Sequence, residues 1–109
     1  MNLKLGKNQI KIKECNTFLS RLKGFMFTKK EINHGLLFDK CSSIHTFFMF
    51  QPIDVILLDK DNNIIKTYES LKPNKVILPI KNVKKVLELP INTIKYINTK
   101  KIILNEEKD

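Results

Sequence analysis

The sequence has no tryptophan, only three glycines and four prolines, and no tract of low complexity. So little glycine and proline excludes a collagen-like or low-complexity chain. No apolar run approaches the roughly 18 residues of a membrane-spanning helix, and the N-terminus lacks the apolar segment of a secretory signal. We therefore expect a soluble cytoplasmic protein that forms a single domain over residues 1–109.

Cysteine is also scarce, because Cys15 and Cys41 are the only two thiols. They lie far apart and show no Cys-x-x-Cys spacing, so neither a structural zinc site nor a thioredoxin-like redox site is indicated. A domain of this size folds without a disulfide. We expect both thiols to be reduced, and we predict no bound metal and no cofactor.

Arginine is represented by Arg21 alone, whereas there are 19 lysines and the net charge is +9. A basic chain invites a nucleic-acid interpretation. Arginine is the preferred partner of phosphate and guanine, however, and it is nearly absent here. The phenylalanines sit in apolar runs and are not interleaved with lysine as in a base-stacking surface. Lysines on solvated faces are the favoured interpretation, and nucleic acid is an unlikely partner.

Short apolar runs separated by turn residues predict a mainly β chain. Leucine and isoleucine alternate with lysine on both sides of Gly6-Lys7-Asn8, which predicts an N-terminal hairpin with strands at Leu3–Leu5 and Ile10–Ile12. The further predicted strands are Leu36–Phe38, Ile44–Phe50, Ile53–Asp59, Ile64–Tyr68, Val76–Leu78, Val83–Leu89 and Lys101–Leu104.

Two short helices are expected beside these strands. Asn16 or Thr17 can cap the first, and Gly24 ends it. The second follows Pro90. Asn92 or Thr93 can cap this second helix. The residues expected on the buried sides are Phe18, Leu19 and Leu22 in the first helix, and Ile94 and Ile97 in the second. The tail Asn105 to Asp109 is expected to be frayed.

Four stretches in a fixed order resemble one known family. They are "RLKGFM" (21–26), "GLLF" (35–38), "SIHTFFMFQPIDVILLD" (43–59) and "VLELP" (86–90). Together they resemble the landmarks of domain of unknown function 192 (DUF192), over about residues 15–104. The resemblance implies an α+β, mainly β fold: a small, strongly curved antiparallel sheet or partly closed barrel with one or two short helices. It implies no agreed activity, substrate or cofactor, and some members occur beside pilus and secretion components.

The chain departs from that family pattern at two turns. Ile91-Asn92 stands where the family usually has a glycine after "LELP", and Asn98-Thr99 stands where it usually has Gly-Asp before the last strand. Asparagine tolerates the left-handed conformation that glycine would adopt. We therefore expect the turns to be kept, without any role for a Gly-Asp carboxylate.

The most apolar stretch, Cys41 to Asp59, also carries the reactive side chains. In an extended strand, Cys41 and His45 face the same way but lie about 13 Å apart, too far to form a catalytic dyad or share a metal ion. Only a bulge at Ser42-Ser43 would bring them together. A hairpin with its turn at Gln51-Pro52 would place Met49 opposite Asp54. We therefore predict no catalytic residue and no metal site.

Asp54 lies among apolar residues, and a buried carboxylate needs a partner. Arg21 is the candidate, because a lone arginine in a lysine-rich chain suggests a need for its bidentate guanidinium. The alternatives are an anion-binding or ligand-binding patch around Arg21, or an exposed Arg21 with Asp54 capping a turn. His45 is the candidate polar group at a pocket mouth. Arg21, His45, Met49 and Asp54 are thus the predicted ligand-binding residues.

Two classes of function remain open. The first is a non-enzymatic binding or accessory module that meets a protein partner or a small ligand, linked by the family resemblance to surface-appendage or secretion systems. The alternative is an enzyme or metal-binding domain using His45, Cys41 and Asp54. The sequence does not determine the oligomeric state.

Overall fold

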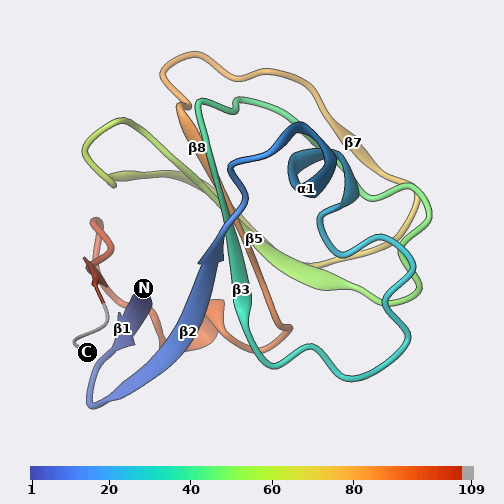
Figure 1. Cartoon of the computed structure of the whole chain (residues 1–109). Helices are drawn as coiled ribbons and strands as arrows, with labels where there is room; N and C mark the ends of the chain where they lie inside the picture. The colour runs from blue at the N-terminus through green and yellow to red at the C-terminus, as the bar shows by residue number, and fades with distance from the viewer. Residues whose placement is uncertain (107–109) are drawn as a thin grey trace.

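The computed structural model describes residues 1–106 and is mainly β, with one strongly curled half-barrel sheet (Figure 1). The strands are β1 (Asn2–Leu5), β2 (Asn8–Glu14), β3 (Gly35–Asp39), β4 (Ile44–His45), β5 (Ile53–Leu58), β6 (Ile64–Leu71), β7 (Val76–Ile77), β8 (Lys85–Leu89) and β9 (Leu104–Asn105). Seven of them form the sheet in the order β6-β5-β8-β3-β2-β1-β9, and β4 pairs separately with β7.

The sheet is mixed, so the expected purely antiparallel arrangement is wrong at one position. β2 and β3 run parallel with Ile12 beside Gly35, whereas the other paired strands are antiparallel. The chain between β2 and β3 crosses over the sheet through a helix, because parallel neighbours cannot be joined by a tight turn. A Cβ at Gly35 would lie 2.5 Å from Ile12 Cδ1, so glycine is required for this close pairing.

The three central strands β3, β5 and β8 are buried on both faces, which explains their continuous apolar sequences. Alternate side chains enter two separate cores. One core lies under the helical crossover and contains Phe25, Leu36, Phe38, Met49, Ile53, Val55, Leu57, Ile77, Val83 and Val86, among others. The other lies inside the curl and contains Leu3, Ile12, Leu37, Ile56, Leu58, Leu87, Leu89, Ile94 and Ile102.

The predicted N-terminal hairpin is confirmed, with Leu3 paired to Ile10. The predicted strand Ile44–Phe50 is wrong beyond its first two residues. Thr46 is fully buried, and its Oγ1 donates to the Lys72 carbonyl (2.7 Å) and accepts the Lys75 N–H (2.8 Å). The chain therefore leaves the strand at Thr46. The hairpin at Gln51-Pro52 is also wrong, because β4 pairs with β7 and β5 lies between β6 and β8.

Helical residues are few. The helix α1 (Phe18–Lys23) begins and ends as predicted: Thr17 forms a capping box with Ser20, and Gly24 follows with φ 49°. The predicted buried side is wrong for Leu19 and Leu22, which are 74% and 53% exposed, and the side chain of Phe18 lies outside the described part.

The second predicted helix is only a 3-10 turn, η1 (Ile94–Tyr96), in which Ile94 is buried but the neighbouring Ile97 is only half-buried. Thr93 precedes it without a side-chain cap. Asn92 adopts the left-handed conformation expected of it, with φ 67°. No helix within residues 1–106 is long and apolar enough to span a membrane.

The C-terminal segment contacts two distant parts of the sheet. Lys101 forms an isolated bridge to Asn63, which precedes β6, and Leu104 pairs with Leu3 in β1. The last strand, β9, is therefore shorter than the predicted Lys101–Leu104. The predicted fraying is wrong at Asn105, which pairs with Asn2, and residues 107–109 lie outside the described residues.

Candidate functional site

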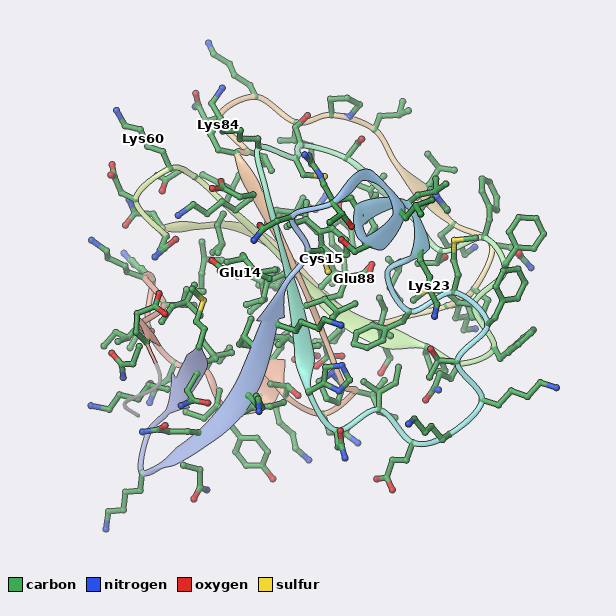
Figure 2. The ribbon with its side chains drawn as sticks, viewed as in Figure 1. Glu14, Cys15, Lys23, Lys60, Lys84 and Glu88 are labelled. Atoms are coloured by element: carbon green, nitrogen blue, oxygen red, sulfur yellow. The ribbon has the colours of Figure 1, made fainter. Side chains whose placement is uncertain are left out.

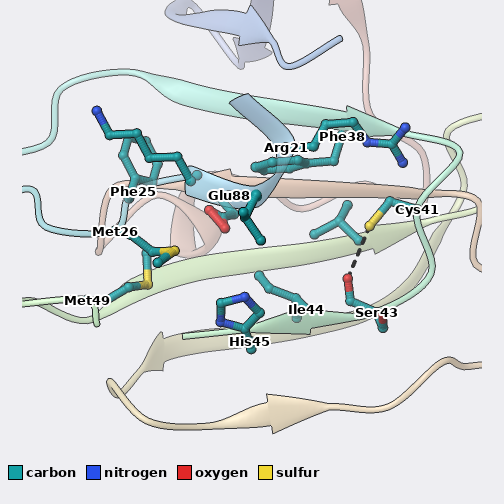
Figure 3. Close-up of a pocket in the computed structure, with 14 residues that line it drawn as sticks. Arg21, Phe25, Met26, Phe38, Cys41, Ser43, Ile44, His45, Met49 and Glu88 are labelled. Atoms are coloured by element: carbon teal, nitrogen blue, oxygen red, sulfur yellow. Dashed lines mark hydrogen bonds between the residues drawn. The ribbon is translucent and has the colours of Figure 1, made fainter. Parts of the chain in front are cut away.

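A cavity of about 80 Å³ opens between α1, the strand β4 and the α1-facing side of the sheet (Figure 3). Its walls come from segments that are far apart in the sequence. The lining residues are Arg21, Leu22, Lys23, Gly24, Phe25, Met26, Phe38, Cys41, Ser43, Ile44, His45, Met49, Val86 and Glu88. Most of these side chains are apolar, so the charged and polar members of the set determine its chemistry.

Glu88 is the polar group buried in this cavity, and sequence reasoning missed it. It is 4% exposed, and its Oε2 has no hydrogen-bond partner within the described chain. Burial raises the pKa of Glu88 to about 8, so the carboxyl holds its proton at neutral pH. Its signal in the sequence was a single acidic residue inside the apolar run "VLELP".

Gly24 allows the backbone to pass directly over this carboxyl. A Cβ at Gly24 would lie 3.1 Å from both Glu88 oxygens and 3.4 Å from the Phe38 ring. The Gly24 N–H does not satisfy the carboxyl, because it donates to the Ser20 carbonyl at the end of α1. Glu88 is thus enclosed by α1 without receiving a hydrogen bond from it.

Replacing Gly24 with alanine is expected to lower the free energy of unfolding by about 1–3 kcal/mol, because φ 49° with ψ −127° is strained for any residue with a Cβ and the new Cβ would press on both Glu88 oxygens. Urea unfolding measures this loss. Gly6→Ala is the matched control, since Gly6 also has a positive φ but nothing lies within 4 Å of its Cβ position. An equal loss in both variants would show that contact with Glu88 adds nothing.

Arg21 and His45, two of the predicted ligand-binding residues, both line the cavity. The exposed Arg21 donates from Nη2 to the Lys40 carbonyl (3.0 Å). The half-buried His45 accepts the Phe47 N–H at Nδ1 (3.3 Å), and its ring stacks on Phe47 with centroids 5.4 Å apart. With Nδ1 accepting, the neutral ring carries its proton on Nε2.

Two methionines, Met26 and Met49, form one end of the cavity in Figure 3. Each is next to a phenylalanine in the left-handed conformation, Phe27 (φ 62°) or Phe48 (φ 64°), which is uncommon for so bulky a residue. The Phe27 N–H donates to the Phe48 carbonyl (2.9 Å) and ties the two turns together. The rings are exposed and stack on each other, while Met49 is buried.

Cys41 lines the same cavity as His45, and β4 begins only at Ile44, so no continuous strand runs from Cys41 to His45. Its Sγ–H donates to the Ser43 carbonyl (3.1 Å). The other thiol, Cys15, lies near Glu88 in Figure 2. Burial raises the pKa of Cys15, and so does the Glu88 carboxylate, which is ionised at the alkaline pH where this thiol titrates. Among residues 1–106, no group of three or more His, Cys, Asp or Glu side chains is placed to hold a metal ion.

Asp54 does not line the cavity, and the predicted ion pair with Arg21 is wrong. Its carboxylate is 1% exposed and accepts three backbone N–H groups: Ser70 at 2.9 Å, Thr93 at 3.0 Å and Ile94 at 2.9 Å. Thr93 immediately precedes η1 and Ile94 is its first residue, so two of the three donors lie at the start of η1. Asp54 therefore binds the backbone at the turn before η1, as one of the alternatives expected, while a ligand-binding patch around the exposed Arg21 stays a prediction.

Comparison with known proteins identifies relatives. The family model DUF192, described as "Uncharacterized ACR, COG1430", matches residues 1–101. UPF0127 proteins of Thermococcus sibiricus and Thermococcus kodakarensis are both 34% identical, over 81% and 78% of this chain, and that of Pyrococcus abyssi is 32% identical over 74%. The matches cover 60%, 57% and 72% of those proteins, so this chain spans about three fifths of the first two.

Two crystal structures share the fold. A protein of unknown function from Novosphingobium aromaticivorans DSM 12444 has a TM-score of 0.74 at 15% identity, over 93% of this chain and 79% of that one. A putative transcription regulator from Sinorhizobium meliloti 1021 has a TM-score of 0.69 at 22% identity, over 86% and 81%. These likenesses show the fold alone. The family match over residues 1–101 shows that the chain belongs to the uncharacterised DUF192 family.

Proposed function

We propose that this protein is a non-enzymatic binding module whose cavity beside α1 receives a small ligand anchored on Glu88. The observation that carries the proposal is the buried Glu88 Oε2, which has no partner among the described residues. Leaving a buried polar group unpaired costs about 1–3 kcal/mol. A ligand that completes the hydrogen bond would recover this free energy on binding.

The rest of the cavity supports the same function. Apolar and aromatic walls around a few polar groups, here with the buried Glu88 among them, are typical of small-ligand sites. The volume of about 80 Å³ is far below that of a site for a large cofactor, so the ligand is a short molecule or one side chain of a partner protein. Arg21 and His45 line the same cavity, which supports them as further contacts of the ligand.

The alternative of an enzyme or metal-binding domain using His45, Cys41 and Asp54 is less well supported. The three backbone donors already engage the Asp54 oxygens, and Asp54 is not among the cavity residues. The Cys41 thiol donates to a carbonyl and has no base bonded to it. A link to surface-appendage or secretion systems rests on the family resemblance alone.

The test compares a library of very small fragments on the wild type and on Glu88→Leu. We expect at least one fragment to raise the melting temperature of the wild type, because a ligand of the folded state stabilises it, and to leave Glu88→Leu unchanged. Leu78→Ala, an exposed change outside the cavity, is the control and keeps the response. A fragment that stabilises wild type and Glu88→Leu equally would remove Glu88 from the site.

A further inference from the structure

We propose that the cavity selects a primary amide carried on a short apolar chain, because its buried carboxyl needs a hydrogen-bond donor and an acceptor side by side. This inference rests on the proposed binding function and names its ligand class. A free amide and the side chain of a glutamine or asparagine share this chemistry.

The first step is the hydrogen-bonding state of Glu88. The buried Oε2 has no hydrogen-bond partner among the described residues, and the Gly24 N–H at the adjacent helix end donates to the Ser20 carbonyl instead. With its pKa at about 8, the group is a neutral acid that offers one O–H donor and one C=O acceptor from the same carbon. A primary amide offers the matching C=O and N–H, so the two groups can form two parallel hydrogen bonds.

Charged alternatives fit less well. An ammonium ligand would enter beside Arg21 and Lys23 in a chain of net charge +9, and it offers no acceptor to the O–H of the protonated Glu88. A carboxylate accepts the Glu88 O–H but offers nothing to its carbonyl oxygen, and burying its charge is costly. An alcohol donates or accepts through a single atom and cannot span both oxygens.

The walls around Glu88 suit the apolar part of such a ligand. Phe25 and Phe38 provide aromatic faces, and Met26 and Met49 provide flexible thioethers that adapt to an alkyl chain. In Figure 3 the methionines lie at one end and the Cys41–Ser43 contact at the other, with Glu88 between them. A ligand that reaches the Glu88 carboxyl is therefore surrounded by apolar side chains.

The experiment is an NMR titration of the full chain with four compounds of equal chain length: butyramide, butylammonium, butyrate and 1-butanol. At a pH about 1.5 units below the Glu88 pKa, we expect butyramide to bind at least tenfold more tightly than the others. Raising the pH to about one unit above that pKa weakens butyramide binding about tenfold in the wild type, because one protein in about eleven keeps the protonated carboxyl.

Glu88→Gln is the matched variant, since its amide keeps a donor and an acceptor at every pH. Its butyramide affinity is expected to stay constant over the same range. Tighter binding of butylammonium or butyrate than of butyramide overturns the amide inference but leaves the binding function intact. Binding of none of the four compounds contradicts both. If Glu88→Gln does not fold, the wild-type pH profile and the four-compound ranking still decide.

A fifth compound separates the two sources of the amide. N-acetyl-glutamine methylamide that binds more tightly than butyramide identifies a glutamine side chain of a protein partner as the ligand. Weaker binding identifies a free small amide, because the peptide backbone then clashes at the cavity mouth. Both results support a primary amide as the ligand. If butylammonium binds and neither amide does, the amide inference is overturned.

Discussion

Glu88→Gln is expected to abolish most of the loss of stability that the wild type shows between mildly acidic and alkaline pH. In the unfolded chain the Glu88 carboxyl releases its proton near its ordinary value of 4.5, whereas in the folded protein it releases it at about 8. Between these values the folded state binds more protons, so the free energy of unfolding falls as pH rises and levels off above about 8. The interval of about 3.5 pH units corresponds to roughly 5 kcal/mol.

Urea unfolding at about pH 5, 7 and 9 measures this difference. The wild type and Glu88→Gln should have similar stability at the lowest pH, and the variant should be the more stable at the highest. Glu69→Gln, a substitution of an exposed glutamate on β6, controls for the chemical change itself and should run parallel to the wild type. A Glu88→Gln profile that also runs parallel to the wild type would show that the carboxyl is not desolvated.

The stability cost of Glu88 bears directly on its role. A leucine at this position on β8 would continue the apolar strand without desolvating a carboxyl, so the needs of the fold do not account for the acid. Natural proteins tolerate such costs where function requires them.

The elements that the sequence predicted well are those governed by local chemistry. The hairpin at Gly6-Lys7-Asn8, the capping of α1 at Thr17 and its end at Gly24 depend on neighbouring residues alone. The central strands were recognisable because burial on both faces leaves an apolar run. The path after His45 was not recognisable, because it is set by contacts of Thr46 with residues 26 and 29 positions away.

The candidate site was predicted only in part for the same reason. His45, Arg21 and Met49 do lie at one cavity, but their grouping depends on the crossover of α1 over the sheet, which periodicity cannot show. Glu88 belongs to a strand that looked wholly structural. Asp54 was recognised as a buried carboxylate in need of partners, but its donors are backbone groups far along the chain, which no side-chain pattern indicates.

Asp54→Ala is expected to lower the free energy of unfolding by about 3–5 kcal/mol, because it leaves three backbone N–H groups without their acceptor. The hydrogen bonds from Thr93 and Ile94 are fully buried, so water does not replace the carboxylate there. Asp59→Ala is the matched control. Asp59 accepts a hydrogen bond from the Asn63 side chain and two from backbone N–H groups, which hold its pKa below the usual range, but it does so in a solvated turn. Its loss should be much smaller, because water replaces the carboxylate there.

A double-mutant cycle separates this network from the ion pair that the sequence suggested. With Asp54 bonded to the backbone and Arg21 bonded to the Lys40 carbonyl, the coupling between Asp54→Ala and Arg21→Ala should be near zero. A coupling above about 1 kcal/mol would restore the pair. Because Asp54 joins β5 to Ser70 and to η1, away from the cavity, its loss should reduce stability while any ligand affinity of the remaining folded protein is preserved.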